Sequence, residues 1–186
     1  MATITGTIFD DFLVGTAEAD TIRGLAGSDD LYGQSGNDTI SGASGFDLLD
    51  GALGNDLLAG GSDADLLLGY TGNDRLRGEG GDDDLFGESG NDQLSGGSGD
   101  DYLEGGAGTD ILTGGSGADI FAFSGPGTGV DTVRDYSFTQ FDVIETYGFG
   151  FVSYESGNDT VIDFGTFGGV QNRIVLEDYI GDFWFV

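Results

Sequence analysis

A nine-residue repeat runs through most of the chain and limits what it can fold into. From Gly6 the sequence divides without insertion into thirteen consecutive blocks, which end at Ala122. The first residue of every block is Gly, the sixth is Asp, and the eighth is Leu, Ile or Phe. The fourth is Gly except at Phe9, Glu18 and Asp63. Three positions kept in phase over 117 residues predict a solenoid of stacked units.

The residue types in one block predict its local structure. Glycine at positions one and four permits the backbone angles of a tight turn. Positions seven to nine then form a short strand, in which the apolar position eight faces the core and its neighbours face outward. Two such strands are needed to enclose a core, so two blocks complete one turn of the coil. The result is two parallel sheets about 10 Å apart.

The position-six aspartates fall into two columns, because blocks two apart lie directly above each other at roughly 4.8 Å. Unneutralised carboxylates at that spacing repel one another strongly, and Ca²⁺ binds carboxylate and carbonyl oxygens. A turn-forming role alone would accept Asn or Ser, so strict Asp indicates a need for charge. One column contains Asp11, Asp29, Asp47, Asp65, Asp83, Asp101 and Asp119; the other contains Asp20, Asp38, Asp56, Asp74, Asp92 and Asp110. These columns offer up to about 11 calcium sites, the sites near the three position-four exceptions being the least regular.

The blocks resemble G-G-x-G-x-D-x-U-x, the nonapeptide of RTX (repeats-in-toxin) calcium-binding proteins. Only Gly61, Gly97, Gly106 and Gly115 supply the second glycine of that motif. The resemblance implies an all-β fold, in which residues 1–122 form a right-handed parallel β-roll that folds on binding Ca²⁺. Further calcium ligands are expected from backbone carbonyls near Gly24, Gly27, Gly33, Gly36, Gly42, Gly45, Gly51, Gly54, Gly69, Gly72, Gly78, Gly81, Gly87, Gly90, Gly96, Gly99, Gly105, Gly108, Gly114 and Gly117.

Composition disfavours several other functions. The chain carries 34 acidic residues against five arginines, for a formal net charge of −29, which argues against nucleic acid as a partner. It contains no Cys or His, which excludes disulfides, thiolate or imidazole metal sites, and Ser–His or Cys–His catalysis. No apolar run approaches the roughly 18 residues of a membrane span, so membrane insertion is not expected. Because the aspartates belong to a repeat rather than to a cleft, we expect the protein not to be an enzyme.

Residues 123–186 leave the repeat and contain several strand-like runs. We expect them to form a small β-sandwich-like cap, because the last strands of a solenoid must be covered. This segment is similar to the C-terminal part of secreted RTX metalloproteases. Its ending Asp182, Phe183, Trp184, Phe185 and Val186 resembles their signal for the type I secretion apparatus. That resemblance implies a secreted, extracellular or cell-surface protein that folds in external calcium; a plain terminal strand is the alternative.

The outward positions seven and nine are far more apolar in odd-numbered blocks, which form the odd face, than in even-numbered blocks, which form the even face. A tall exposed apolar stripe is unusual for a monomer, so we expect either the C-terminal region or a second copy to cover the odd face. Ordinary tolerance of exposed apolar side chains is the alternative. The candidate interaction face comprises Phe12, Val14, Tyr32, Leu48, Leu66, Leu68, Phe86, Tyr102 and Ile120.

Three functions therefore remain open from the sequence. The first is a secreted calcium-binding module whose folding is driven by calcium. The second is a structural protein that self-assembles into a surface layer, matrix or fibre through the odd face and the C-terminal region. The third is a polysaccharide-binding module, which the small number of basic residues disfavours.

Overall fold

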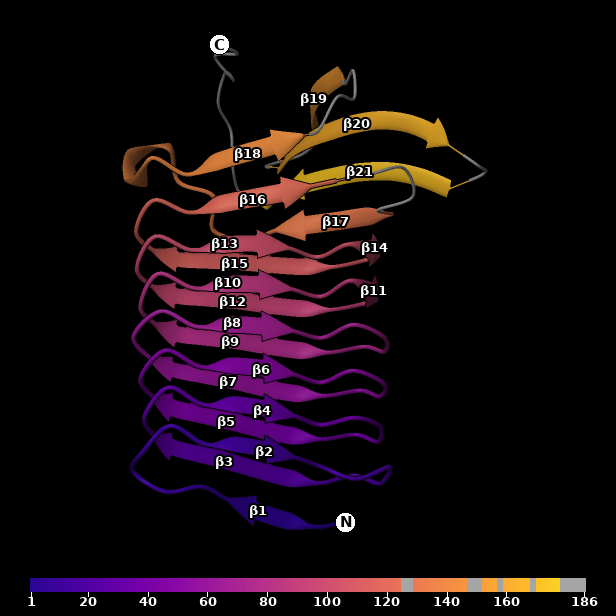
Figure 1. The fold of residues 1–186 in the computed structure, drawn as a ribbon. Helices are drawn as coiled ribbons and strands as arrows, with labels where there is room; N and C mark the ends of the chain where they lie inside the picture. The colour runs from indigo at the N-terminus through magenta and orange to yellow at the C-terminus, as the bar shows by residue number, and fades with distance from the viewer. Residues whose placement is uncertain (125–128, 147–151, 157–158, 168–169, 178–186) are drawn as a thin grey trace.

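The computed structural model describes residues 1–124, 129–146, 152–156, 159–167 and 170–177. The chain winds into a coil whose stacked turns form two facing β-sheets (Figure 1). In chain-neighbour order the first sheet contains β1 (Thr3–Thr5), β3 (Thr21–Ala26), β5 (Thr39–Ser44), β7 (Leu57–Ser62), β9 (Arg75–Gly80), β12 (Gln93–Ser98), β15 (Ile111–Ser116), β17 (Val130–Val133), β21 (Val170–Leu176), β20 (Asp159–Phe167) and β19 (Val152–Ser156). This sheet carries the even face.

The second sheet carries the odd face. It contains β2 (Phe12–Val14), β4 (Asp30–Tyr32), β6 (Leu48–Asp50), β8 (Leu66–Leu68), β10 (Asp84–Phe86), β13 (Tyr102–Glu104), β16 (Ile120–Phe123) and β18 (Val143–Thr146). A short pair, β11 (Ser89–Gly90) and β14 (Ala107–Gly108), and the 3₁₀ turn η1 (Phe138–Gln140) complete the described elements. None of the described helical segments is long and apolar enough to cross a membrane.

Strand register confirms that two blocks complete one turn. Within the repeat each strand pairs in parallel with the strand 18 residues further on, as Ile22 does with Ile40 and Leu31 with Leu49. Strands of the two sheets run in opposite directions, as the arrows in Figure 1 show. The strands of the first sheet are longer than predicted, because they continue through positions one to three of the following block.

The core is a column of position-eight side chains between the two sheets. From Ile22 to Phe121 each of them is buried, at 0–2% exposure, whereas Leu13 in the first turn is only partly buried. Full burial of one Leu or Ile side chain contributes roughly 1.5–3 kcal/mol. Each turn adds two such side chains, so the core grows only as turns stack and no single turn encloses a core alone.

Both sheets continue past the predicted domain boundary at residue 122. β17 pairs in parallel with β15, and β18 pairs in parallel with β16, so the coil makes a further turn after the last regular block. β21 then joins β17 in parallel, and β20 and β19 follow in antiparallel order. The expected C-terminal cap is thus built directly onto the ends of the solenoid sheets (Figure 1).

Candidate metal centres along the two aspartate columns

The position-six aspartates lie in two columns, as their spacing predicts, and hydrogen bonds that the sequence did not predict join successive members. In each column the Oδ1 atom of one Asp accepts a hydrogen bond from the backbone amide of the Asp one turn earlier. The Asp56 amide donates to Asp74 Oδ1 at 2.8 Å, and the Asp65 amide donates to Asp83 Oδ1 at 2.8 Å. One oxygen of each carboxylate is therefore used to hold successive turns in register.

The other carboxylate oxygen has no partner in eleven of the thirteen blocks. These Oδ2 atoms are buried and accept no hydrogen bond from any described residue. A buried charge without a partner is strongly unfavourable, so each of these atoms would be stabilised by a positive group. The eleven residues are Asp29, Asp38, Asp47, Asp56, Asp65, Asp74, Asp83, Asp92, Asp101, Asp110 and Asp119.

Glycine at position one leaves room beside each of these oxygens. A Cβ atom placed on Gly69 would lie 2.7 Å from Asp74 Oδ2 and 3.0 Å from the carbonyl oxygen of Gly87, one turn later. Both distances are shorter than real Cβ atoms normally show. A side chain would thus fill a small cradle bordered by a carboxylate oxygen and a backbone carbonyl, which explains why position one is always Gly.

Burial raises the pKa of most of these carboxyl groups. Desolvation is the largest cause, and it raises the pKa of Asp56, Asp65, Asp92 and Asp101 to about 7. Hydrogen bonds from the preceding Asp amides act in the opposite direction, and neighbouring carboxylates raise the pKa further. The bare columns therefore hold their negative charge at neutral pH only at a considerable cost.

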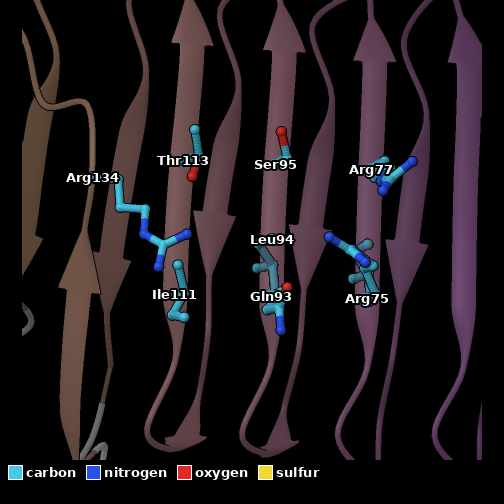
Figure 2. Close-up of a pocket in the computed structure, with 9 residues that line it drawn as sticks. Arg75, Arg77, Gln93, Leu94, Ser95, Ile111, Thr113 and Arg134 are labelled. Atoms are coloured by element: carbon cyan, nitrogen blue, oxygen red, sulfur yellow. The ribbon is translucent and has the colours of Figure 1, made fainter.

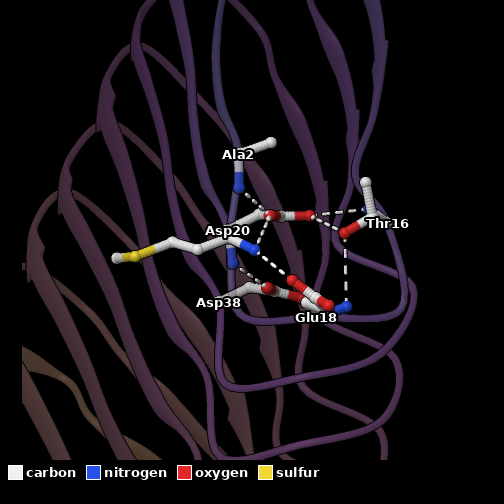
Figure 3. A network of polar contacts seen from close by, with 6 residues as sticks. Ala2, Thr16, Glu18, Asp20 and Asp38 are labelled. Carbon is white, nitrogen blue, oxygen red and sulfur yellow. Dashed lines mark hydrogen bonds and ion pairs between the residues drawn. The ribbon is translucent and has the colours of Figure 1, made fainter.

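The first two blocks are built differently. The backbone amide and the hydroxyl of Thr16 donate to Asp20 Oδ2 at 2.6 and 2.7 Å, and the Ala2 amide donates to Asp20 Oδ1 (Figure 3). These bonds lower the pKa of Asp20. In the first block the amide and hydroxyl of Thr7 bind Asp11 Oδ2 in the same way, at 2.5 and 3.0 Å.

The exceptional residues at position four explain this difference in part. Glycines at position four adopt positive φ angles, and Asp63 does so as well, at 75°. Phe9 and Glu18 are not among the positive-φ residues, so their blocks follow a different turn. In those two blocks a threonine at position two supplies the hydrogen bonds that the other eleven carboxylates lack. The Oδ2 atoms of Asp11 and Asp20 therefore already have donors, which argues against the sequence prediction that these two residues bind a cation.

The donor atoms of the other eleven blocks fit a calcium ion. Ca²⁺ prefers six to eight oxygen ligands and accepts both carboxylate and backbone carbonyl oxygens. Within the described residues no group of three acidic side chains converges on one point, so each site must combine the free Oδ2 atom with carbonyls such as that of Gly87. A bound ion would supply the positive charge that the columns lack. The backbone carbonyls of the position-four glycines were also predicted to bind calcium, and this stays a prediction.

Two further aspartates continue the columns beyond the repeat. Asp131 Oδ1 accepts from the Asp110 amide at 2.9 Å, and Asp142 Oδ1 accepts from the Asp119 amide at 3.2 Å. They lie 21 and 23 residues after their predecessors instead of 18, so a search in strict nine-residue phase misses them. The signal that could have found them is an Asp two residues before a β-branched core residue, namely Val133 and Ile144.

These two carboxylates end the columns in different ways. The amide of Ser137 donates to Asp142 Oδ2 at 2.7 Å. Asp131 lies beneath Ile174 of β21, and burial together with the neighbouring Asp110 raises its pKa to about 9. Burial thus disfavours the charged form of Asp131 at the end of its column.

The remaining predicted sites have different outcomes. Residues 182–186, the predicted secretion signal, lie outside the described residues. Of the candidate interaction face, Phe12 is 68% exposed and Val14 38%, while the other members are partly buried by neighbours in their own columns. The described C-terminal strands extend the sheet ends and do not lie across this face (Figure 1).

Comparison with known proteins identifies the repeat. The family model of the RTX calcium-binding nonapeptide repeat matches four times, at residues 5–40, 32–67, 60–94 and 86–121. No curated protein matches the chain. Among solved structures the chain is similar to an extracellular lipase from Serratia marcescens, at 20% identity and a TM-score of 0.39, over 92% of this chain but only 38% of the lipase. It is also similar to the R3 subunit of the mannuronan C5-epimerase AlgE6 from Azotobacter vinelandii, at 28% identity and a TM-score of 0.27, over 63% of this chain and 73% of that subunit.

Proposed function

Because the chain belongs to the RTX calcium-binding nonapeptide repeat family, we propose that it is a non-catalytic extracellular protein whose folding is driven by Ca²⁺ after type I secretion. The observation that carries this proposal is the set of eleven buried Oδ2 atoms without partners. Each is a charge that the fold removes from water without compensation, and such a charge costs several kcal/mol. The metal-free coil should therefore be unstable at neutral pH.

Calcium binding and folding are then one process. The carboxylate of one turn and the glycine carbonyl of the next come together only in the coil, so the unfolded chain has no preformed site and the binding free energy becomes folding free energy. Eleven ions would bring about 22 positive charges to a chain whose formal net charge is −29. Their binding would remove most of the self-repulsion that opposes a compact state.

This dependence suits export in the unfolded state. A chain that stays unfolded where calcium is scarce can pass a secretion channel and fold where calcium is abundant. The sequence resemblance of the C-terminal region to RTX metalloproteases supports this route. A non-catalytic role rests on the commitment of the aspartates to the ladder, in which every Oδ1 atom of the repeat from Asp29 to Asp119 accepts a backbone amide.

The test is circular dichroism and sedimentation across a calcium titration, with bound calcium counted by equilibrium dialysis. We expect a steep transition from an expanded chain to a compact β-protein with about eleven bound ions, and a much weaker response to Mg²⁺, which demands a rigid octahedral site. An equally compact β-protein after exhaustive chelation, with no calcium uptake, would overturn the proposal.

A second candidate function is a self-assembling structural protein. The specific observation in its favour is the odd face, which keeps Phe12 largely exposed and which no described C-terminal strand crosses. Calcium-dependent association measured by sedimentation separates this candidate from an isolated folding module.

A further inference from the structure

Two pairs of outward charges recur at a spacing of three turns. On the even face Arg23 of β3 and Arg77 of β9 occupy position nine and lie 54 residues apart. On the odd face Asp30 of β4 and Asp84 of β10 occupy position seven and also lie 54 residues apart. Since 18 residues make one turn, both pairs are spaced by three turns, or roughly 14 Å along the stack.

These four charged side chains are exposed and have no partner within the described residues. None of them forms an ion pair or a side-chain hydrogen bond there, although the chain carries 34 acidic residues. Arg23 and Asp30 cannot meet within one molecule, because they project from opposite outer faces with the core between them. The same holds for Arg77 and Asp84. A second molecule is needed to bring these charges together.

The strand directions allow such a contact. Strands of the two sheets run in opposite directions (Figure 1). When a second copy lies alongside with its axis parallel, an even strand overlies an odd strand with position nine above position seven. A shift of half a turn along the axis then places Arg23 opposite Asp30 of the other copy, because the two residues lie in consecutive blocks. The same shift places Arg77 opposite Asp84, because both spacings are three turns.

The uncharged rows between these pairs are also complementary in this register. Ala59 comes opposite Leu66, and Leu57, which is 37% exposed, comes opposite Leu68. Further along, the even face presents short polar side chains, which form a row with Arg77 (Figure 2). In that row Ser95 and Thr113 would face Tyr102 and Ile120 of the odd face. No row places two charges of the same sign opposite each other.

From this register we infer that the even face of one molecule docks on the odd face of a second copy, with axes parallel and half a turn out of step. The contact is heterologous, so each dimer keeps one free even face and one free odd face and the assembly is open-ended. The inference deepens the proposed function, because only the calcium-folded coil presents the two faces. The contact area is small, about one strand segment wide and roughly 34 Å tall, so the association is weak.

The test compares charge reversals by sedimentation velocity at high protein concentration in saturating calcium. Arg77→Glu and Asp84→Arg should each lower the association constant about ten-fold or more, because each places like charges opposite each other. The double variant Arg77→Glu/Asp84→Arg should restore association, since the reversed pair meets again between copies. Mixing the two single variants should also restore association, because the even face of each variant then meets an odd face of opposite charge on the other and the two variants alternate in the assembly.

Net charge alone predicts a different pattern, which makes the result decisive. Asp84→Arg makes the acidic protein less negative, so nonspecific repulsion would fall and association would rise. Circular dichroism of each variant in calcium must match the parent protein. Association that rises for Asp84→Arg, or that the double variant fails to restore, overturns the inference while the calcium-folding proposal stands. The inference would also be overturned if neither the parent protein nor any variant self-associated. The same holds if an acidic polysaccharide bound the parent protein but not Arg77→Glu in the absence of self-association.

Discussion

Replacement of one central aspartate by asparagine should have opposite effects with and without calcium. Asp74→Asn keeps the oxygen that accepts the Asp56 amide at 2.8 Å but removes the charge beside the Gly69 cradle. In calcium the variant loses one site. At a calcium concentration 100 times the dissociation constant, one site contributes about 2.7 kcal/mol to the free energy of unfolding, which corresponds to a fall of roughly 5–10 °C in melting temperature for a chain of this size.

In chelator the sign reverses, because the substitution removes a buried carboxylate whose Oδ2 atom has no partner. Burial raises the pKa of Asp74, which shows that the metal-free fold disfavours its charge. The matched control is Asp20→Asn in the same column, where Thr16 already satisfies the oxygen. The control should leave the number of bound calcium ions unchanged and lower stability by about 1 kcal/mol through lost hydrogen bonds.

The assay is thermal unfolding followed by circular dichroism, in saturating calcium and in chelator, together with a count of bound calcium. The reasoning is wrong if Asp74→Asn and Asp20→Asn lower calcium stoichiometry equally. It is also wrong if Asp74→Asn destabilises the protein to the same extent in both conditions, since the carboxylate would then act without a cation.

Three further predictions follow from the same geometry. Gly69→Ala should remove one calcium site, since its methyl group would fill the cradle, whereas Gly80→Ala, whose Cβ would mainly meet the Ser98 hydroxyl at 3.1 Å, should be tolerated; isothermal titration calorimetry distinguishes them. Without calcium, acidification from pH 8 to pH 5 should increase β-structure, because carboxyl groups with a native pKa near 7, such as Asp56 and Asp65, bind protons more readily in the coil than in the unfolded chain; circular dichroism in chelator that shows no gain would contradict this. Asp142→Ala should weaken the last turn, because it leaves the Asp119 and Ser137 amides without their acceptor, and faster hydrogen exchange should appear there before it appears at Leu67.

The regular part of the fold was predictable because every block solves the same local problem with the same residues. Glycine at position one, aspartate at position six and an apolar residue at position eight predict the turn, the aspartate columns and the core, and the register of Ile22 with Ile40 follows from the 18-residue turn. The further turn built on Asp131 and Asp142 was not predictable in the same way. Three extra residues precede Asp131 and two more precede Asp142, so both aspartates fall out of the nine-residue phase. Only the pairing of β17 with β15 and of β18 with β16 reveals their position.

The sequence by itself determined the period, the core column and the chemical identity of the candidate ligands, because these depend on residue type at fixed spacing. Only the tertiary structure decided which carboxylates keep a buried oxygen without a hydrogen-bond partner. Asp20 and Asp74 are the same residue at the same position of the repeat, yet Thr16 satisfies one and nothing in the described chain satisfies the other. That difference arises from the path of a turn and from contacts between successive turns, and neither is contained in the identity of the residue.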